Sequence, residues 1–130
     1  MKKVFVSYAH DDSDFAQRLL ASLDDAEVSW WMDSADIASG EAFALKIKES
    51  ITSANAVVVL VSPRSINDQW IQFEVGAAWA LGKRVILILV GGADSEFTLP
   101  VWFSGFAFLD ARNRPMQDVA MDVAQAISAE

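Results

Sequence analysis

Residues 56–90 read AVVVLVSPRSINDQWIQFEVGAAWALGKRVILILV, and this stretch decides the fold. Two nearly continuous apolar runs, at 56–61 and 84–90, enclose a longer segment at about 68–82 that we predict to be a helix. Short apolar runs rich in valine and isoleucine are typical of parallel strands that are covered on both faces. The stretch therefore predicts a strand–helix–strand unit with a right-handed crossover.

The same alternation extends to both ends of the 130-residue chain. Five strands that alternate with helices indicate an α/β domain with a doubly wound, mostly parallel sheet. We expect the flavodoxin-like strand order 2-1-3-4-5, which places the topological switch between the first and third strands. Ligands in such sheets bind beyond the carboxyl ends of the strands at the switch. The other predicted elements are strands at 4–8, 28–32 and 106–109 and helices at about 12–25, 42–53 and 115–129.

Length and composition favour a single packed domain over residues 1–130. Apolar residues make up 53% of the chain and charged residues 22%, as in ordinary globular domains. A chain of this size buries roughly two-thirds of its unfolded surface, so it needs no disulfide or metal to fold. Because there is no cysteine and only one histidine, His10, we expect no metal site.

Charge and hydropathy narrow the choice of partners. The net charge is −8, and an acidic surface repels phosphate backbones, so nucleic acid is not an expected partner. The apolar runs have the length of strands, so no membrane partner is expected either. Lys2 and Lys3 precede an apolar run that is too short for a signal peptide, and we therefore expect a cytoplasmic location.

The segments after the first and third strands argue against three kinds of phosphate site. No glycine follows the first strand, so neither a G-x-G-x-x-G turn nor a P-loop is present. A response-regulator receiver would need a phosphoacceptor carboxylate after the third strand, where this chain has Ser62 and Pro63. His10, at the expected crevice, is either a ligand contact or a partner in a loop hydrogen bond.

Local signals also mark the ends of helices. Asp11, Asp12 and Asp14 lie at the start of the 12–25 helix, where carboxylates cap free amides and suit the helix dipole. For Asp11 and Asp12 this capping role is favoured over metal binding. Gly82, followed by Lys83, is expected to end the 68–82 helix.

Glu74 is the most informative side chain, because it is the only charge between Gln69 and Gly82. Trp70 lies four residues before Glu74, so the two share a helix face. Apolar surroundings raise the pKa of a carboxyl group, which is common in catalytic acids and stabilisers. The residues alone leave other roles open: exposure on a helix face, or an ion pair with one of three cations. These cations are Lys48, Arg64 and Lys83.

In combination, these motifs resemble the Toll/interleukin-receptor (TIR) domain family. VFVSYAHDD (4–12) resembles the first box of the family, and WWMDSADIASGE (30–41) resembles its BB loop. Residues 57–89 are similar to its third strand, helix and fourth strand, including a Ser-Pro turn and the W-x-x-x-E pattern. VWFSGFAFLD (101–110) is similar to the Phe-Trp box, with the two aromatic residues in reverse order. The resemblance covers essentially the whole chain.

The resemblance implies an enzyme that cleaves the nicotinamide–ribose bond of NAD+, which is a substrate and not a cofactor. Glu74 would drive the cleavage, and the products would be nicotinamide and either ADP-ribose or a cyclic ADP-ribose. Some enzymatic members carry arginines where this chain has Ala9 and His10, so its phosphate contacts are expected to differ. Ser62 is inferred as a pocket contact from its position only. The other implied substrate contacts are Tyr8, Ala9, His10, Asp33, Phe43 and Trp70.

The resemblance implies a second class of function as well. Other TIR domains are adaptors or scaffolds that bind further TIR domains and catalyse nothing, and a virulence factor that interferes with host TIR signalling is a related case. The working surface would be the BB loop, with Asp36, Ile37 and Gly40. The two classes are compatible, because enzymatic relatives become active on head-to-tail assembly through that loop. The retained pair of Trp70 and Glu74 favours the enzyme.

Overall fold

The computed structural model of the protein describes residues 3–33, 49, 51–63, 65, 69–91, 106–112 and 114–128. In this part of the chain, five parallel strands form one sheet in the order β2-β1-β3-β4-β5, which confirms the predicted flavodoxin-like order. Every strand lies within a residue or two of its predicted position. The strands are β1 (Lys3–Ser7), β2 (Ser29–Asp33), β3 (Ala56–Val61), β4 (Arg84–Leu89) and β5 (Ala107–Asp110).

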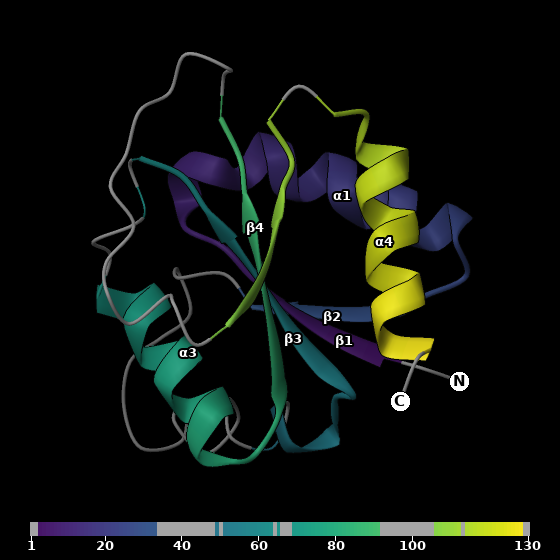
Figure 1. The fold of residues 1–130 in the computed structure, drawn as a ribbon. Helices are drawn as coiled ribbons and strands as arrows, with labels where there is room; N and C mark the ends of the chain where they lie inside the picture. Colours follow the sequence, from purple (N-terminus) through teal and green to yellow (C-terminus); the bar gives the residue numbers. More distant parts are fainter. Residues whose placement is uncertain are drawn as a thin grey trace.

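Helices cover both faces of the sheet (Figure 1). α1 and α4 pack on one face, and α3 packs on the other, so each face has its own apolar cluster. Residues 51–53 are helical, whereas 42–48 of the second predicted helix lie outside the described residues. The helices are η1 (His10–Asp12, one 3₁₀ turn), α1 (Ser13–Asp25), α3 (Gln69–Ala80) and α4 (Met116–Ser128).

Strand alternation decides which side chain of β1 meets which helix. Successive side chains of a strand point to opposite faces of the sheet. Val4 and Val6 therefore lie in the cluster with α1 and α4, and Phe5 lies in the cluster with α3. Ser7 has the same parity as Phe5 and faces α3.

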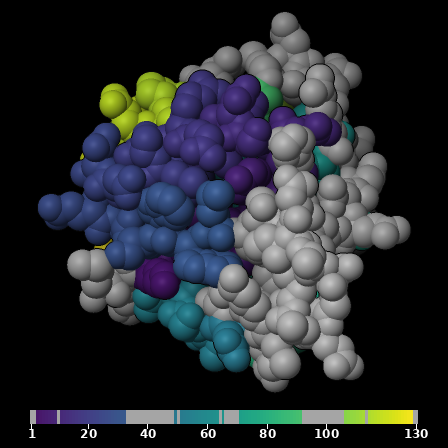
Figure 2. Space-filling model, turned by 180° about the vertical axis from the view of Figure 1, so that it is seen from behind, coloured from purple at the N-terminus to yellow at the C-terminus, as the bar shows by residue number. Residues whose placement is uncertain are grey.

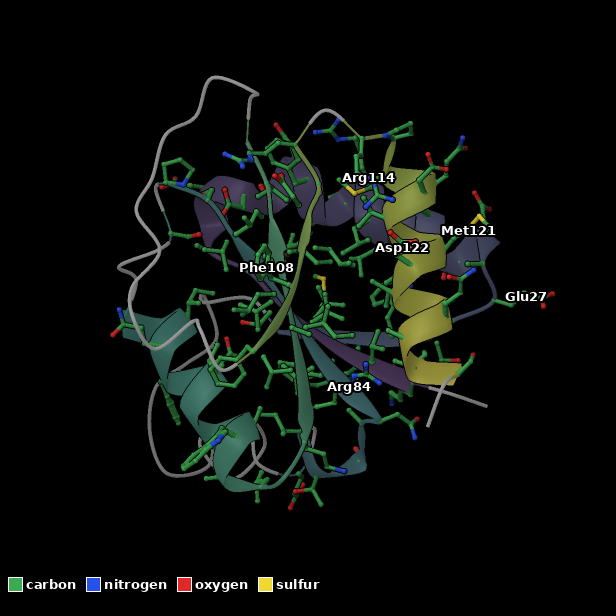
Figure 3. The ribbon with its side chains drawn as sticks, in the orientation of Figure 1. Glu27, Arg84, Phe108, Arg114, Met121 and Asp122 are labelled. Atoms are coloured by element: carbon green, nitrogen blue, oxygen red, sulfur yellow. The ribbon has the colours of Figure 1, made fainter. Side chains whose placement is uncertain are left out.

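The other face of the sheet is tied to α4 by a long side chain. Arg84 begins β4, and its Nη1 donates a hydrogen bond of 2.7 Å to the carbonyl oxygen of Ala126 (Figure 3). Arg114 lies just before α4 and forms an ion pair of 2.7 Å with Asp122, eight residues further along the chain.

Seen from behind, α1 and the edge strand β2 form one continuous surface in purple to blue (Figure 2).

The start of α1 differs from the prediction. Asp12 occupies the N-cap position, but its side chain makes no capping hydrogen bond. The carboxylate is buried and accepts a hydrogen bond from Ser62, 50 residues further along the chain. The predicted capping role of Asp12 is therefore wrong, because a buried hydroxyl, and not a free helix amide, is its partner.

Among the described residues, no helix is both long and apolar enough to cross a membrane.

Candidate active site

Buried polar side chains gather at one edge of the sheet. In the described part of the chain they are Ser7, Asp12, Ser62, Ser65 and Glu74. Ser7 is the last residue of β1, and Ser62 directly follows β3, its neighbour in the sheet. A buried polar group is costly unless it is hydrogen-bonded, so a collection of them needs a reason. The collection lies at the carboxyl ends of the two strands that flank the topological switch, where ligands bind in this fold.

Glu74 belongs to the side of α3 that packs on the sheet. Ile71, Val75 and Ala78 are buried at the spacing of one helix face, and Glu74 lies among them. Its relative exposure is 0%, which rules out the alternative of a solvent-exposed glutamate. The carboxylate lies beneath the surface in this structure.

The carboxylate of Glu74 meets the hydroxyl of Ser7. Ser7 Oγ donates a hydrogen bond of 2.5 Å to Glu74 Oε1, and both side chains are fully buried. The bond gives both buried polar groups a partner, and burying either of them alone would cost free energy. In the sheet, Ser7 is paired with Asp33 of β2 and with Val59 of β3. The carboxylate is thus held at the carboxyl end of the central strand β1.

Of the three cations named as alternative ion-pair partners of Glu74, Lys83 has a different partner. The Lys83 ammonium group donates a hydrogen bond of 3.0 Å to the carbonyl oxygen of Ala54, which precedes β3. Ala54 lies at the amino end of β3, whereas Ser7 and Glu74 meet at the carboxyl end of β1. Lys83 is therefore bound at the opposite edge of the sheet. Lys48 and Arg64 lie outside the described residues.

A second buried cluster joins the turns after β1 and β3. Ser62 Oγ donates to Asp12 Oδ2 over 3.0 Å, and the Ser62 backbone amide donates to Ser65 Oγ over 2.8 Å. The Ser65 amide in turn donates to Ser62 Oγ over 3.2 Å. The predicted pocket residue Ser62 is therefore part of a link between two turns. No local pattern in the sequence indicates that Ser62 and Asp12 are partners, because they lie 50 residues apart.

The backbone places several other predicted contacts near this edge. Ala9 follows β1 by two residues and is buried in the α3-side cluster, and His10 begins η1. Asp33 is the last residue of β2, directly opposite Ser7 in the sheet register. Trp70 is the second residue of α3, one turn before Glu74. The predicted residues Asp36, Ile37, Gly40 and Phe43 lie outside the described residues.

Tyr8 points away from Glu74. Its ring is buried in the cluster of α1 and α4, on the other face of the sheet, and its hydroxyl donates to the sulfur of Met32 over 3.6 Å. Strand alternation explains this, since neighbours Ser7 and Ala9 face α3. The structure therefore does not bring the Tyr8 ring together with the Glu74 carboxylate.

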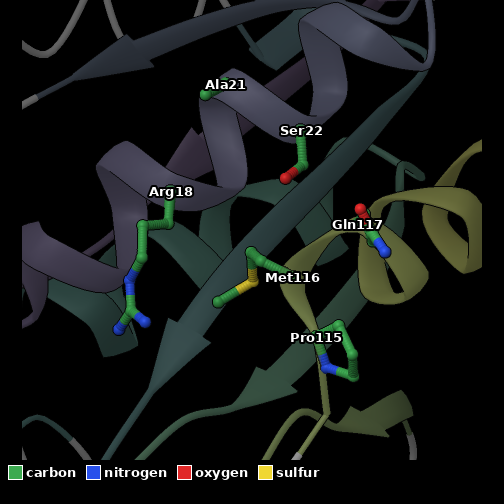
Figure 4. Close-up of a pocket in the computed structure, with 6 residues that line it drawn as sticks. All are labelled: Arg18, Ala21, Ser22, Pro115, Met116 and Gln117. Atoms are coloured by element: carbon green, nitrogen blue, oxygen red, sulfur yellow. The ribbon is translucent and has the colours of Figure 1, made fainter.

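A groove elsewhere on the surface is separate from this site. It has a volume of about 460 Å³ and is largely open to solvent. Arg18 and Ser22 of α1 form one wall, and Pro115 and Met116 at the start of α4 form the other (Figure 4). Since α1 and α4 cover the face opposite to α3, this groove does not reach Glu74.

As for metal ions, the described residues contain no group of three or more histidine or acidic side chains that could hold one.

Fold and site together define a class. The protein is a doubly wound α/β domain of flavodoxin-like order whose buried carboxylate lies at the topological switch. A family model for the TIR domain matches residues 4–126, and the chain belongs to the TIR domain family.

Known relatives agree with this assignment. The chain is 27% identical over 99 residues to NAD(+) hydrolase TcpC of Escherichia coli O6:H1, which covers 75% of this chain. It is 30% identical over 87 residues to 2' cyclic ADP-D-ribose synthase BtTIR of Bacteroides thetaiotaomicron, which covers 64% of this chain. In both comparisons the match spans only 30% of the relative's length. Among solved structures, the TIR domain of the Toll-related receptor TRR-2 from Hydra magnipapillata superposes with a TM-score of 0.75 at 20% identity, covering 96% of this chain and 97% of that one.

Proposed function

We propose that this TIR domain cleaves the nicotinamide–ribose bond of NAD+ and that Glu74 is its catalytic carboxylate. The observation that carries the proposal is the buried carboxylate of Glu74, held by Ser7 at the carboxyl end of β1. Apolar helices rarely bury a carboxylate, and such groups cluster at functional sites. Two relatives are named as an NAD(+) hydrolase and as a 2' cyclic ADP-D-ribose synthase, which supports the same substrate.

The chemistry suits a single carboxylate. When the C1′–N bond of NAD+ breaks, its electron pair stays on the nicotinamide nitrogen, so the leaving group departs neutral without an acid. Positive charge develops on the ribose, and an ionised carboxylate aimed at that charge stabilises the transition state. A pair of carboxylates, as in ordinary glycosidases, is not required. Water that attacks C1′ loses a proton and gives ADP-ribose, whereas a nucleophile of the same molecule gives a cyclic product.

The neighbouring segments are proposed to bind the substrate. Ala9, His10 and Asp33 adjoin Ser7 through the chain or the sheet register, so their backbones lie beside the proposed reaction centre. Phe43 and Trp70 are proposed to stack on the nicotinamide or the adenine and to exclude water. For Tyr8 we propose a backbone contact only, because its ring packs on the other face of the sheet. Ser62 is proposed to shape the pocket through its bond to Asp12.

Burial of Glu74 adds a condition to the proposal. A carboxylate with no exposed surface cannot reach a ribose, so the enzyme must open before it reacts. We propose that assembly with other TIR domains through Asp36, Ile37 and Gly40 drives this opening. The active form would then be an oligomer, and the isolated domain would be nearly inactive at low concentration.

The same burial favours a second candidate function. A fully buried glutamate with a hydroxyl partner is also a reasonable structural element, and a domain that uses it so would act as an adaptor or scaffold. Such a domain would bind other TIR domains and leave NAD+ intact.

The deciding experiment compares three proteins at high concentration, or crowded on beads, with NAD+. Nicotinamide, ADP-ribose and cyclic products are separated by chromatography. Wild type is expected to release nicotinamide, and Glu74→Gln is expected to be slower by about 100-fold or more, because it keeps the shape and loses the charge. Glu49→Gln removes the same charge from an exposed site and should behave as wild type.

Two results would contradict the proposal. No nicotinamide from crowded wild-type protein would favour the adaptor. Equal release of nicotinamide by wild type and Glu74→Gln would show that the charge of Glu74 is not needed for the reaction. Thermal melting of each protein shows whether a loss of activity reflects a loss of folding.

A further inference from the structure

Ser7 is a polar residue in the middle of an apolar environment. It follows Val4, Phe5 and Val6 in the central strand, and all four side chains are fully buried. On the same face of the sheet, the described apolar neighbours are Phe5, Val57, Val59 and Ala9, in the cluster against α3. A hydroxyl in such surroundings is unfavourable unless it has a hydrogen-bond partner. The partner here is the carboxylate of Glu74.

The anchor of this hydrogen bond is rigid. β1 pairs in parallel with β2 on one side and with β3 on the other, and Ser7 has a registered partner in each. The Cα of Ser7 is therefore fixed from both sides, and its short side chain has few rotamers. A glutamate side chain has three rotatable bonds, and holding it in one arrangement costs conformational entropy. The hydrogen bond from the fixed Ser7 hydroxyl, 2.5 Å from Oε1, offsets part of this entropy cost.

The direction of the bond also matters for charge. A serine hydroxyl that donates to a carboxylate favours the ionised form over the neutral acid. Burial acts in the opposite direction, since it disfavours a charged group. The Ser7 hydroxyl thus offsets part of the effect of burial at the one place where the proposed reaction needs a negative charge.

We propose that Ser7 is a positioning residue for Glu74, whose hydroxyl sets the orientation and the charge of the carboxylate. This inference rests on the proposed NAD+ cleavage for its kinetic consequence. Its structural consequence, the effect of Ser7 on the ionisation of Glu74, stands independently of any activity.

The test compares Ser7→Ala, which removes the donor, with Ser7→Thr, which keeps it. Ser7→Ala is expected to lower kcat by about 10- to 100-fold with little change in KM, and Ser7→Thr should recover most of the loss. The acidic limb of the pH–rate profile should move to higher pH in Ser7→Ala, because the lost donor had favoured the ionised form. Ser7→Cys has a weak donor of similar size and should fall between the two.

The matched control is Val6→Ala. Val6 is the neighbouring residue of β1, is equally buried and faces α1 and α4, so this variant weakens the strand without touching Glu74. It should lower the melting temperature and leave the pH–rate profile in place.

A readout without catalysis separates the two proposals. In protein with ¹³C-labelled glutamate, the carboxyl resonance of Glu74 should titrate at higher pH in Ser7→Ala than in wild type. If no variant cleaves NAD+ but this shift is seen, the proposed function fails and the role of Ser7 stands. An unchanged titration, an unchanged pH–rate profile, or a faster Ser7→Ala enzyme would each overturn the inference, the last by showing that the bond restrains Glu74 instead of preparing it.

Discussion

At the scale of single residues, the buried polar side chains in the described part of the chain form two small clusters. Ser7 and Glu74 form one, and Asp12, Ser62 and Ser65 form the other. Each cluster joins segments that are far apart in sequence, by 67 residues in the first and 50 in the second. Such bonds stabilise the fold only when both partners are present, since a lone buried polar group costs free energy. The clusters therefore hold the carboxyl edge of the sheet in one arrangement.

The second cluster leads to a stability prediction. Asp12→Ala should lower the free energy of unfolding by about 1–3 kcal/mol, because the buried hydroxyl of Ser62 loses its charged acceptor. The neighbouring Asp11 is exposed, so Asp11→Ala should change stability by no more than about 0.5 kcal/mol. Urea unfolding followed by circular dichroism measures both values. Equal effects of the two substitutions would show that the Asp12 bond to Ser62 contributes nothing.

At the scale of elements, α1 and α3 end in the same way. In α3, Gly82 has φ +71°, its amide donates to Trp79 O, and the amide of Lys83 donates to Ala78 O. This pair of bonds is a Schellman motif, with glycine in the left-handed position. The end of α1 has the same two bonds, but Glu27 occupies the left-handed position with φ +61°. Glu27 is exposed and points into solvent (Figure 3).

This difference predicts opposite effects at matching sites. Glu27→Gly should stabilise the protein by about 0.5–1 kcal/mol, because glycine adopts positive φ without the Cβ penalty. Gly82→Ala should destabilise it by about 1 kcal/mol through backbone strain alone, since a Cβ at Gly82 meets no atom within 4 Å. Glu27→Ala removes the charge and keeps the Cβ, so it should stay close to wild type. Thermal melts of the three variants test the set, and a stabilised Glu27→Ala would assign the effect to charge instead of backbone.

At the scale of the whole molecule, the net charge affects how copies associate, and the sheet topology decides where the proposed site lies. The net charge of −8 makes identical copies repel one another, so an assembly must depend on specific contacts. The sheet order places the carboxyl ends of β1 and β3 together at one edge, which is where the proposed site lies. We therefore expect activity to depend on protein concentration and to increase as salt screens the repulsion.

The assembly proposal can be tested with two substitutions of an apolar residue by aspartate. Ile37→Asp should lower NAD+ cleavage by about tenfold or more at a concentration where wild type is active, because Ile37 is proposed to lie at the contact between domains. Met121→Asp adds the same charge to an exposed apolar site on α4 and should not. Light scattering with each protein shows whether assembly and activity fall together. Full activity of Ile37→Asp would remove assembly through this loop from the mechanism.

By itself, the sequence determined the elements, their order in the sheet and the family. These follow from local patterns, since apolar runs of strand length, helical spacing and a glycine at the end of α3 act over a few residues. The sequence also singles out Glu74, as the one charge in an apolar helix. Only the tertiary structure decided that Glu74 is fully buried, that Ser7 is its partner and that Asp12 bonds Ser62 instead of capping α1. The physical reason is that a side chain's partner is chosen by the packing of distant segments, and β1 meets α3 and the turn after β3 only once the sheet has formed.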